Sequence, residues 1–133
     1  QGGNYWKPIT STKYYGANRK IILVNRNPKA IFWSMKRRNS LSYPSHDVEI
    51  FVKWYKNIMK FVNSEEHSKV IKIDFENFFS NFESESTKLC EKLNLEKKAQ
   101  HNFDLDHTLK NLYKYKDNLS QYEIDYIDKN LKS

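Results

Sequence analysis

Arg26 and Ser34 are the residues whose types and spacing point most directly to chemistry. Arg26 follows an apolar, β-branched run at 21–24, and Asn27 and Pro28 then open a segment with helical spacing. Ser34 lies eight residues after Arg26, about two turns into that segment. An arginine fork, a hydroxyl and the N–H groups of a helix start together satisfy the oxygens of a phosphate monoester. The stretch therefore predicts an anion site at a strand-to-helix turn.

Both residues also have a purely structural interpretation. Arg26 could form a salt bridge with a nearby carboxylate, and Ser34 could bond back to a carbonyl of its own helix. Asn27 suits the N-cap position and Pro28 the first helical position, where its missing N–H costs nothing. Spacing alone leaves the functional and the structural interpretations open.

Two strands and four helices are the elements that must position this turn. β-Branched runs predict strands at about 20–25 and 69–74, and the long helix between them favours a parallel βαβ arrangement. Apolar periodicity predicts helices at about 28–38, 46–62, 84–93 and 121–132. Ser120 and Glu123 form a capping box before the last helix, and 105–112 carries mixed signals. We expect one α/β domain over 1–133, with 1–19 largely loop.

Composition narrows the class of protein. The chain has 133 residues and a net charge of +7, which favours anionic partners, and its 15% aromatic content argues against disorder. Its one cysteine, Cys90, excludes an internal disulfide and suits a packed helix face. No signal peptide or membrane-spanning stretch is visible, so a cytoplasmic location is favoured. The chain starts at Gln1 without an initiator methionine, so we expect a piece of a longer protein.

The order of these landmarks resembles that of the sulfotransferases that use 3′-phosphoadenosine 5′-phosphosulfate. The run 26–29 with Ser34 resembles the 3′-phosphate-binding motif of that family. Residues 69–78 resemble its later strand and turn, 87–95 resemble the helix that follows, and 110–120 resemble the C-terminal segment that returns basic groups to the cofactor. The resemblance covers the chain from Lys20 to its end.

The resemblance implies the C-terminal portion of a P-loop-NTPase-like sulfotransferase fold. It implies transfer of a sulfuryl group from 3′-phosphoadenosine 5′-phosphosulfate to an acceptor hydroxyl or amine, with 3′-phosphoadenosine 5′-phosphate as product and no metal. The cofactor-binding residues that it implies are Arg26, Ser34, Phe75, Lys110, Asn111 and Lys114.

Three departures from the family pattern limit this reading. No Pro-Lys-Ser-Gly-Thr-Thr-like segment exists in the sequence to wrap the 5′-phosphosulfate and stabilise its leaving oxygen. No His, Asp or Glu precedes Arg26 to act as the base, so no catalytic residue is assigned. Phe75 stands where the family leads us to expect tyrosine. The four histidines, which are His46, His67, His101 and His107, suit surface or capping roles.

Two classes of function stay open at this point. In the first, the chain binds the nucleotide and an unidentified acceptor, and an N-terminal half supplies the donor loop. In the second, it is a non-catalytic basic module that binds a nucleotide, nucleic acid or a sulfated glycan. Nucleic acid ranks lowest because the positive charges are spread along the chain, although 113–116 interleaves Tyr with Lys.

Overall fold

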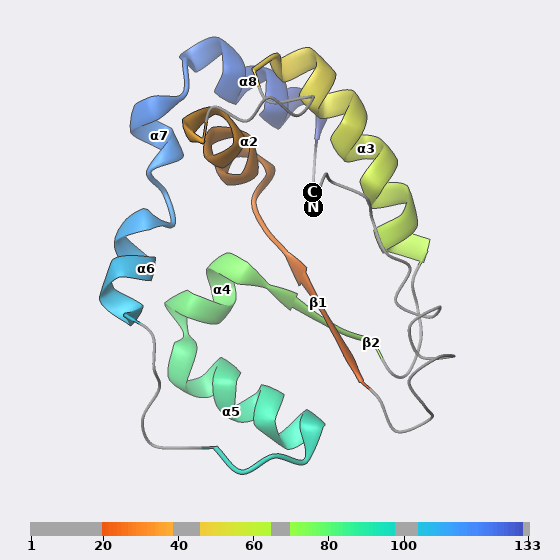
Figure 1. The fold of residues 1–133 in the computed structure, drawn as a ribbon, viewed down its shortest axis with the longest axis vertical. Coiled ribbons are helices and arrows are strands. Elements are labelled where there is room, and N and C mark those ends of the chain that lie inside the picture. Colours follow the sequence, from red (N-terminus) through yellow and green to blue (C-terminus); the bar gives the residue numbers. More distant parts are fainter. Residues whose placement is uncertain (1–19, 39–45, 65–69, 98–103, 132–133) are drawn as a thin grey trace.

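The protein is described by a computed structural model over residues 20–38, 46–64, 70–97 and 104–131 (Figure 1). Within these ranges the chain is α/β and mostly helical, and its two parallel strands form an open sheet. The elements are β1 (Ile21–Asn25), α2 (Pro28–Arg37), α3 (Val48–Ser64), β2 (Val70–Asp74), α4 (Phe75–Ser80), α5 (Phe82–Leu93), α6 (Leu105–Asn111), α7 (Tyr115–Asn118) and α8 (Gln121–Asn130).

The sheet confirms the predicted parallel arrangement. Each strand begins one residue later than expected, and the register runs from Ile21 opposite Val70 to Asn25 opposite Asp74. Because the strands are parallel and in register, the residues that follow Asn25 and Asp74 lie at the same edge of the sheet. Helices α2 and α3 both lie in the connection between the two strands.

The predicted helix starts are held by the expected side chains. Asn27 caps α2, since its Oδ1 accepts a hydrogen bond of 2.9 Å from the N–H of Lys29, and Pro28 is the first helical residue. Ser120 and Glu123 form the predicted capping box of α8. The Ser120 N–H donates to Glu123 Oε1 at 2.9 Å, and the Glu123 N–H donates to Ser120 Oγ at 3.1 Å. These local signals therefore set both helix starts.

Several predicted boundaries were wrong. The helix expected at 84–93 begins at Phe82, and the separate short helix α4 precedes it. Asp74 ends β2 because its Oδ1 accepts a hydrogen bond of 3.2 Å from the N–H of Asn77 and so caps α4. The mixed signals at 105–112 resolve into α6.

The other helices shift by one or two residues. The helix expected at 28–38 ends at Arg37, the one expected at 46–62 spans Val48–Ser64, and the last ends at Asn130 rather than 132. The loop expected at 1–19 lies outside the described residues.

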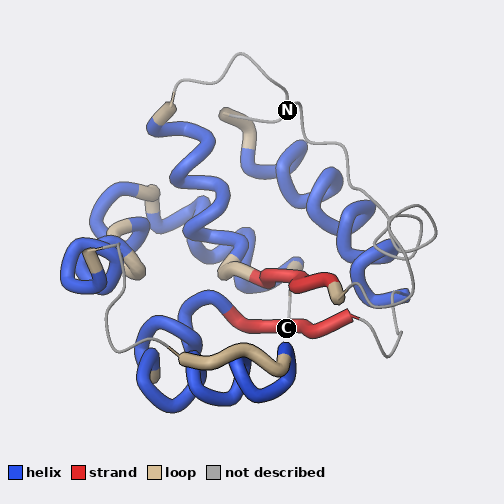
Figure 2. Tube along the Cα trace, turned by 60° about the horizontal axis from the view of Figure 1, so that its bottom comes forward, coloured by secondary structure: helices blue, strands red, loops and turns tan. Residues whose placement is uncertain are grey.

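The core lies among helices rather than against the sheet. Phe32 of α2, Phe51 of α3 and Ile127 of α8 are fully buried, and the rings of Phe32 and Phe51 are 5.0 Å apart. By contrast, Ile22 and Val24 of β1 remain 40% and 49% exposed. Figure 2 shows α4 and α5 beyond β2, on the side away from β1. The helical core therefore holds α2, and α2 in turn holds the turn at the end of β1.

An ion pair fastens the last turn of α2 to α8. Lys36 Nζ lies 2.7 Å from Glu123 Oε2, so the basic run 36–38 is in part structural. Along the described residues, no helix combines the length and the apolar character needed to cross a membrane.

Candidate anion-binding site

A hollow of about 360 Å³ opens where the two strands end. Its polar lining comes from the turn after β1, the start of α4, and α3 and α8. The side chains that matter for its chemistry are Arg26, Lys29, Tyr55, Asp74, Glu76 and Asp128. The parallel register brings the turn after β1 next to the start of α4, because residues 26 and 75 each follow the end of a strand.

Arg26 has an incompletely satisfied side chain in this hollow. Its Cζ lies 4.9 Å from the centroid of the Phe75 ring, so the guanidinium stacks on the first residue of α4. Its Nε is buried and has no hydrogen-bond partner within the described residues. The salt bridge that could have given Arg26 a structural role is not among the ion pairs of the described residues. A buried donor of this kind is uncommon in proteins and calls for an acceptor.

Glu76 occupies part of the site that the sequence assigned to an anion. Its Oε1 accepts a hydrogen bond of 2.9 Å from the N–H of Asn27, next to the start of α2. Its Oε2 is buried and has no hydrogen-bond partner among the described residues. Burial raises the pKa of Glu76, and Asp74 adds to that shift, while the Asn27 hydrogen bond and the charge of Arg26 oppose it. The carboxyl therefore takes up a proton more readily than an exposed glutamate does.

Lys29 and Asn27 are already engaged by the protein. Lys29 Nζ lies 2.5 Å from Asp128 Oδ1 and 5.5 Å from the centroid of the Tyr115 ring. Asn27 Nδ2 donates a hydrogen bond of 3.3 Å to the Tyr115 hydroxyl. These contacts fix the turn to α7 and α8.

Among the contacts of the described residues, Arg26 and Phe75 are the two of the six predicted cofactor-binding residues that touch one another. Ser34 is half-buried in α2 and is not among the described residues that line the hollow. Its Cα lies about 9 Å farther along the helix axis than that of Pro28, since an α-helix rises about 1.5 Å per residue.

The three basic or amide residues near the C-terminus are also placed away from the hollow's lining. Lys110 is exposed in α6, and Lys114 is exposed directly before α7. Asn111 Nδ2 donates a hydrogen bond of 2.8 Å to the carbonyl of His107 on its own helix. None of the three is among the described lining residues of the hollow.

Sequence reasoning missed Glu76 and Tyr55. Tyr55 comes from α3, and burial and the nearby Glu76 carboxylate raise the pKa of its phenol. A signal for Glu76 was present, because residues that follow two parallel strands converge at one edge. No such signal marks Tyr55, whose helical position alone suggests core packing.

The arrangement can bind an oxyanion by charge and by hydrogen bonds. Arg26 offers a charged donor without a partner, and a protonated Glu76 would offer a hydroxyl donor, whereas the charge of Lys29 is already paired with that of Asp128. In the part of the chain that the structure describes, no group of three or more His, Cys, Asp or Glu side chains could hold a metal ion.

Comparisons with known proteins find nothing similar: no protein-family model, no curated protein and no solved structure matches the chain.

Proposed function

We propose that this hollow binds the 3′-phosphate of 3′-phosphoadenosine 5′-phosphosulfate and that the chain belongs to a sulfotransferase. The enzyme would transfer the sulfuryl group of that cofactor to an acceptor hydroxyl or amine. The observation that carries the proposal is Arg26 Nε, a buried donor without a partner beside a hollow of about 360 Å³. Leaving such a group unpaired costs about 1–3 kcal/mol, and a phosphate oxygen would recover that cost.

The surrounding groups suit a phosphate monoester. The Arg26 guanidinium lies over the Phe75 ring, and this contact restricts the arginine side chain, so less entropy is lost when an oxyanion binds. Glu76 opposes the bound charge while it is ionised, but its raised pKa favours the proton that removes this repulsion. The protonated oxygen then donates a hydrogen bond to the phosphate.

Sulfuryl transfer also needs a donor loop, which these 133 residues do not contain. Its backbone N–H groups and lysine would stabilise the charge that develops on the bridging oxygen. In this proposal the present chain holds the 3′ end of the cofactor, while another segment activates its 5′ end. The missing loop favours a second candidate function, a non-catalytic basic module that binds a nucleotide or a sulfated glycan.

A thermal-shift experiment with two isomeric ligands tests the proposal. Adenosine 3′,5′-bisphosphate and adenosine 5′-diphosphate have the same composition, and only the first carries a 3′-phosphate. We expect the first to bind more tightly, because it alone carries the 3′-phosphate, and therefore to raise Tm more than the second. A ligand that binds the folded state at 100 times its Kd adds about 2.7 kcal/mol of stability.

Variants locate the site in the same experiment. Arg26→Ala should abolish the difference between the two isomers, whereas Arg38→Ala, which removes an exposed arginine at the end of α2, should keep it. Equal shifts for the two isomers in the wild-type protein would refute the 3′-phosphate assignment. A larger shift with a heparin oligosaccharide than with either nucleotide would support the second candidate function instead.

A further inference from the structure

A second hollow, of about 260 Å³, runs along one edge of β2. Four consecutive residues of the strand line it, from Ile71 to Asp74. Because successive side chains of a strand point to opposite faces, a hollow that touches all four lies along the strand's edge rather than on one face. No described residue of β1 lines it, and β1 pairs with the other edge of β2. The hollow is therefore a groove at the outer edge of β2.

The wall of the groove opposite the strand comes from α4 and α5. Phe78 and Leu89 line it from these helices, and Figure 2 shows both helices on the side of β2 away from β1. Among the described residues, β2 pairs with β1 alone. The outer edge thus offers backbone N–H and C=O groups, which form a template for an added strand.

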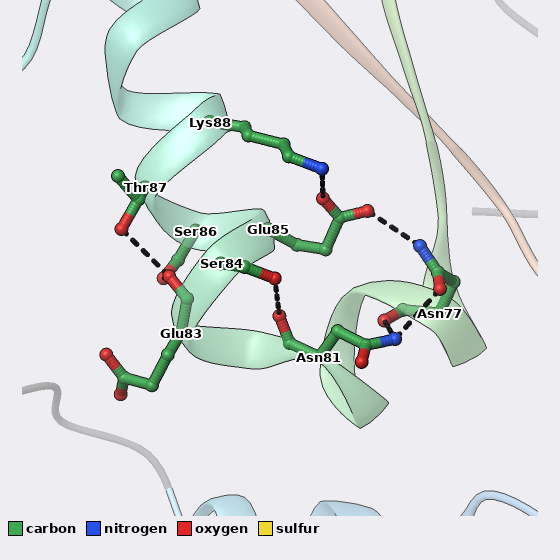
Figure 3. A network of polar contacts seen from close by, with 8 residues as sticks. All are labelled: Asn77, Asn81, Glu83, Ser84, Glu85, Ser86, Thr87 and Lys88. Carbon is green, nitrogen blue, oxygen red and sulfur yellow. Dashed lines mark hydrogen bonds and ion pairs between the residues drawn. The ribbon is translucent and has the colours of Figure 1, made fainter.

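The charged side chains that line the groove are three lysines and two carboxylates, which gives a net charge of +1. Glu85 is engaged on both sides, since its carboxylate accepts a hydrogen bond of 2.6 Å from Asn77 Nδ2 and lies 3.3 Å from Lys88 Nζ (Figure 3). Asp74 is used as the cap of α4. Lys72 and Lys92 also line the groove, and neither has an acidic partner among the described residues.

We propose that this groove docks an extended acidic peptide segment of a partner protein, which adds to the sheet as a strand along β2. Main-chain hydrogen bonds to the edge would supply affinity, as in other cases of strand addition. Alternate apolar side chains of the segment would pack against Ile71, Ile73 and Leu89. Acidic side chains between them would lie near Lys72 and Lys92, so charge complementarity selects an acidic segment. This proposal does not rest on the proposed 3′-phosphate site, although Asp74 lines both hollows.

The probe is a fluorescent peptide of alternating valine and glutamate, about six residues long, the length of an ordinary strand. Its Kd for the full chain is measured by fluorescence anisotropy. Two matched peptides accompany it, one with lysine in place of glutamate and one with alternate backbone nitrogens methylated. We expect the acidic peptide to bind at least about tenfold more tightly than either, a difference of about 1.4 kcal/mol.

Charge reversal tests the location of the site. Lys72→Glu with Lys92→Glu should weaken the acidic peptide at least about tenfold and favour the lysine peptide. Lys53→Glu with Lys56→Glu, which changes two exposed positions of α3 by the same total charge, should leave both affinities unchanged.

Four results would overturn the proposal. The first is that the acidic peptide does not bind, and the second is that the methylated peptide binds equally well. The third is that the two double variants weaken the acidic peptide equally. The fourth is that the free chain associates with itself and that Lys72→Glu with Lys92→Glu abolishes this association. The last result would give the groove to a second copy of the chain. Circular dichroism of each variant establishes that it is folded.

Discussion

A basic residue and a glutamate lie at each end of α2: Lys36 with Glu123 at its end, and Arg26 with Glu76 at its start. The two pairs differ in how fully their polar atoms are hydrogen-bonded. At the end of the helix, Glu123 accepts hydrogen bonds from Lys36 and from the Ser120 N–H, so both of its oxygens are satisfied. At its start, Arg26 and Glu76 each keep a buried polar atom without a partner among the described residues. The same residue types therefore form a structural ion pair at one end of α2 and leave buried polar atoms without partners at the other.

The pKa values of the two glutamates move in opposite directions. Burial acts to raise the pKa of Glu123, but the hydrogen bonds and charge of Lys36 and the Ser120 hydrogen bond outweigh burial and lower it. Burial dominates at Glu76, whose pKa rises. A carboxylate that the protein has fully paired is a structural group, whereas one that the protein leaves partly unpaired in a cleft is a candidate for binding chemistry.

The largest expected effect is the loss of the satisfied pair. Glu123→Ala should lower the free energy of unfolding by about 2 kcal/mol, because it removes half of the capping box and leaves Lys36 without its partner. Urea denaturation measures the change. Asp125→Ala, at an exposed position of the same helix, is the control and should cost about 0.5 kcal/mol. An equal loss of unfolding free energy in Glu123→Ala and Asp125→Ala would mean that the Lys36–Glu123 pair is not a structural pair, and the contrast with Arg26 and Glu76 would then be wrong.

A smaller effect with a distinctive sign is expected at Glu76. Since its folded pKa lies above the ordinary 4.5, the folded state binds the proton more tightly than the unfolded state. Wild-type stability should therefore fall relative to Glu76→Gln as the pH rises from about 4.5 through the raised pKa. Urea denaturation across a pH series measures this difference.

Glu123→Gln supplies the opposite case in the same pH series. The folded pKa of Glu123 is lowered, so its contribution is present above 4.5 and is lost as the pH falls through the lowered pKa. Wild-type stability relative to Glu123→Gln should therefore rise with pH. If wild-type stability relative to Glu76→Gln and relative to Glu123→Gln changed with pH in the same direction, the pKa values of the two carboxyls would be shifted in the same direction, contrary to this account.

The smallest expected effect concerns Lys29, which shares the hollow with Arg26. Asp128→Asn removes its ion-pair partner, whose side chain is 54% exposed. Because exposed ion pairs contribute little, the free energy of unfolding should change by less than about 1 kcal/mol, and added salt should reduce the change further. A loss of unfolding free energy as large as that of Glu123→Ala would show that the Lys29–Asp128 ion pair also stabilises the fold.

The turn at Arg26 could be predicted because its signals are local. A β-branched run, the capping side chain of Asn27 and the fixed φ of Pro28 all lie within a few residues of one another. The parallel pairing of the strands followed from the long helix between them. These signals predicted the turn that carries Arg26, whereas Phe75 was predicted as a site residue only by the resemblance to the sulfotransferases.

The partners of that turn could not be predicted in the same way. Glu76 reaches Asn27 across 49 positions of sequence, and Lys36 reaches Glu123 across 87, so only the packed fold defines these pairs. The start of α4 was missed because Phe75 continues an apolar strand pattern, although Asp74 carried the signal of a helix cap. Ser34 has the family's spacing after Arg26, but that spacing does not place it at the hollow's described lining.

The most direct test of the central claim is the Nε–H resonance of Arg26 in isotope-labelled protein, identified by its loss in Arg26→Lys. If Nε awaits a phosphate oxygen, adenosine 3′,5′-bisphosphate should move this resonance downfield in a saturable way and slow its exchange with water, because a charge-assisted hydrogen bond forms. Adenosine 5′-diphosphate should leave it unmoved. A resonance that responds to neither isomer, or to both alike, would contradict the assignment of the hollow to a 3′-phosphate.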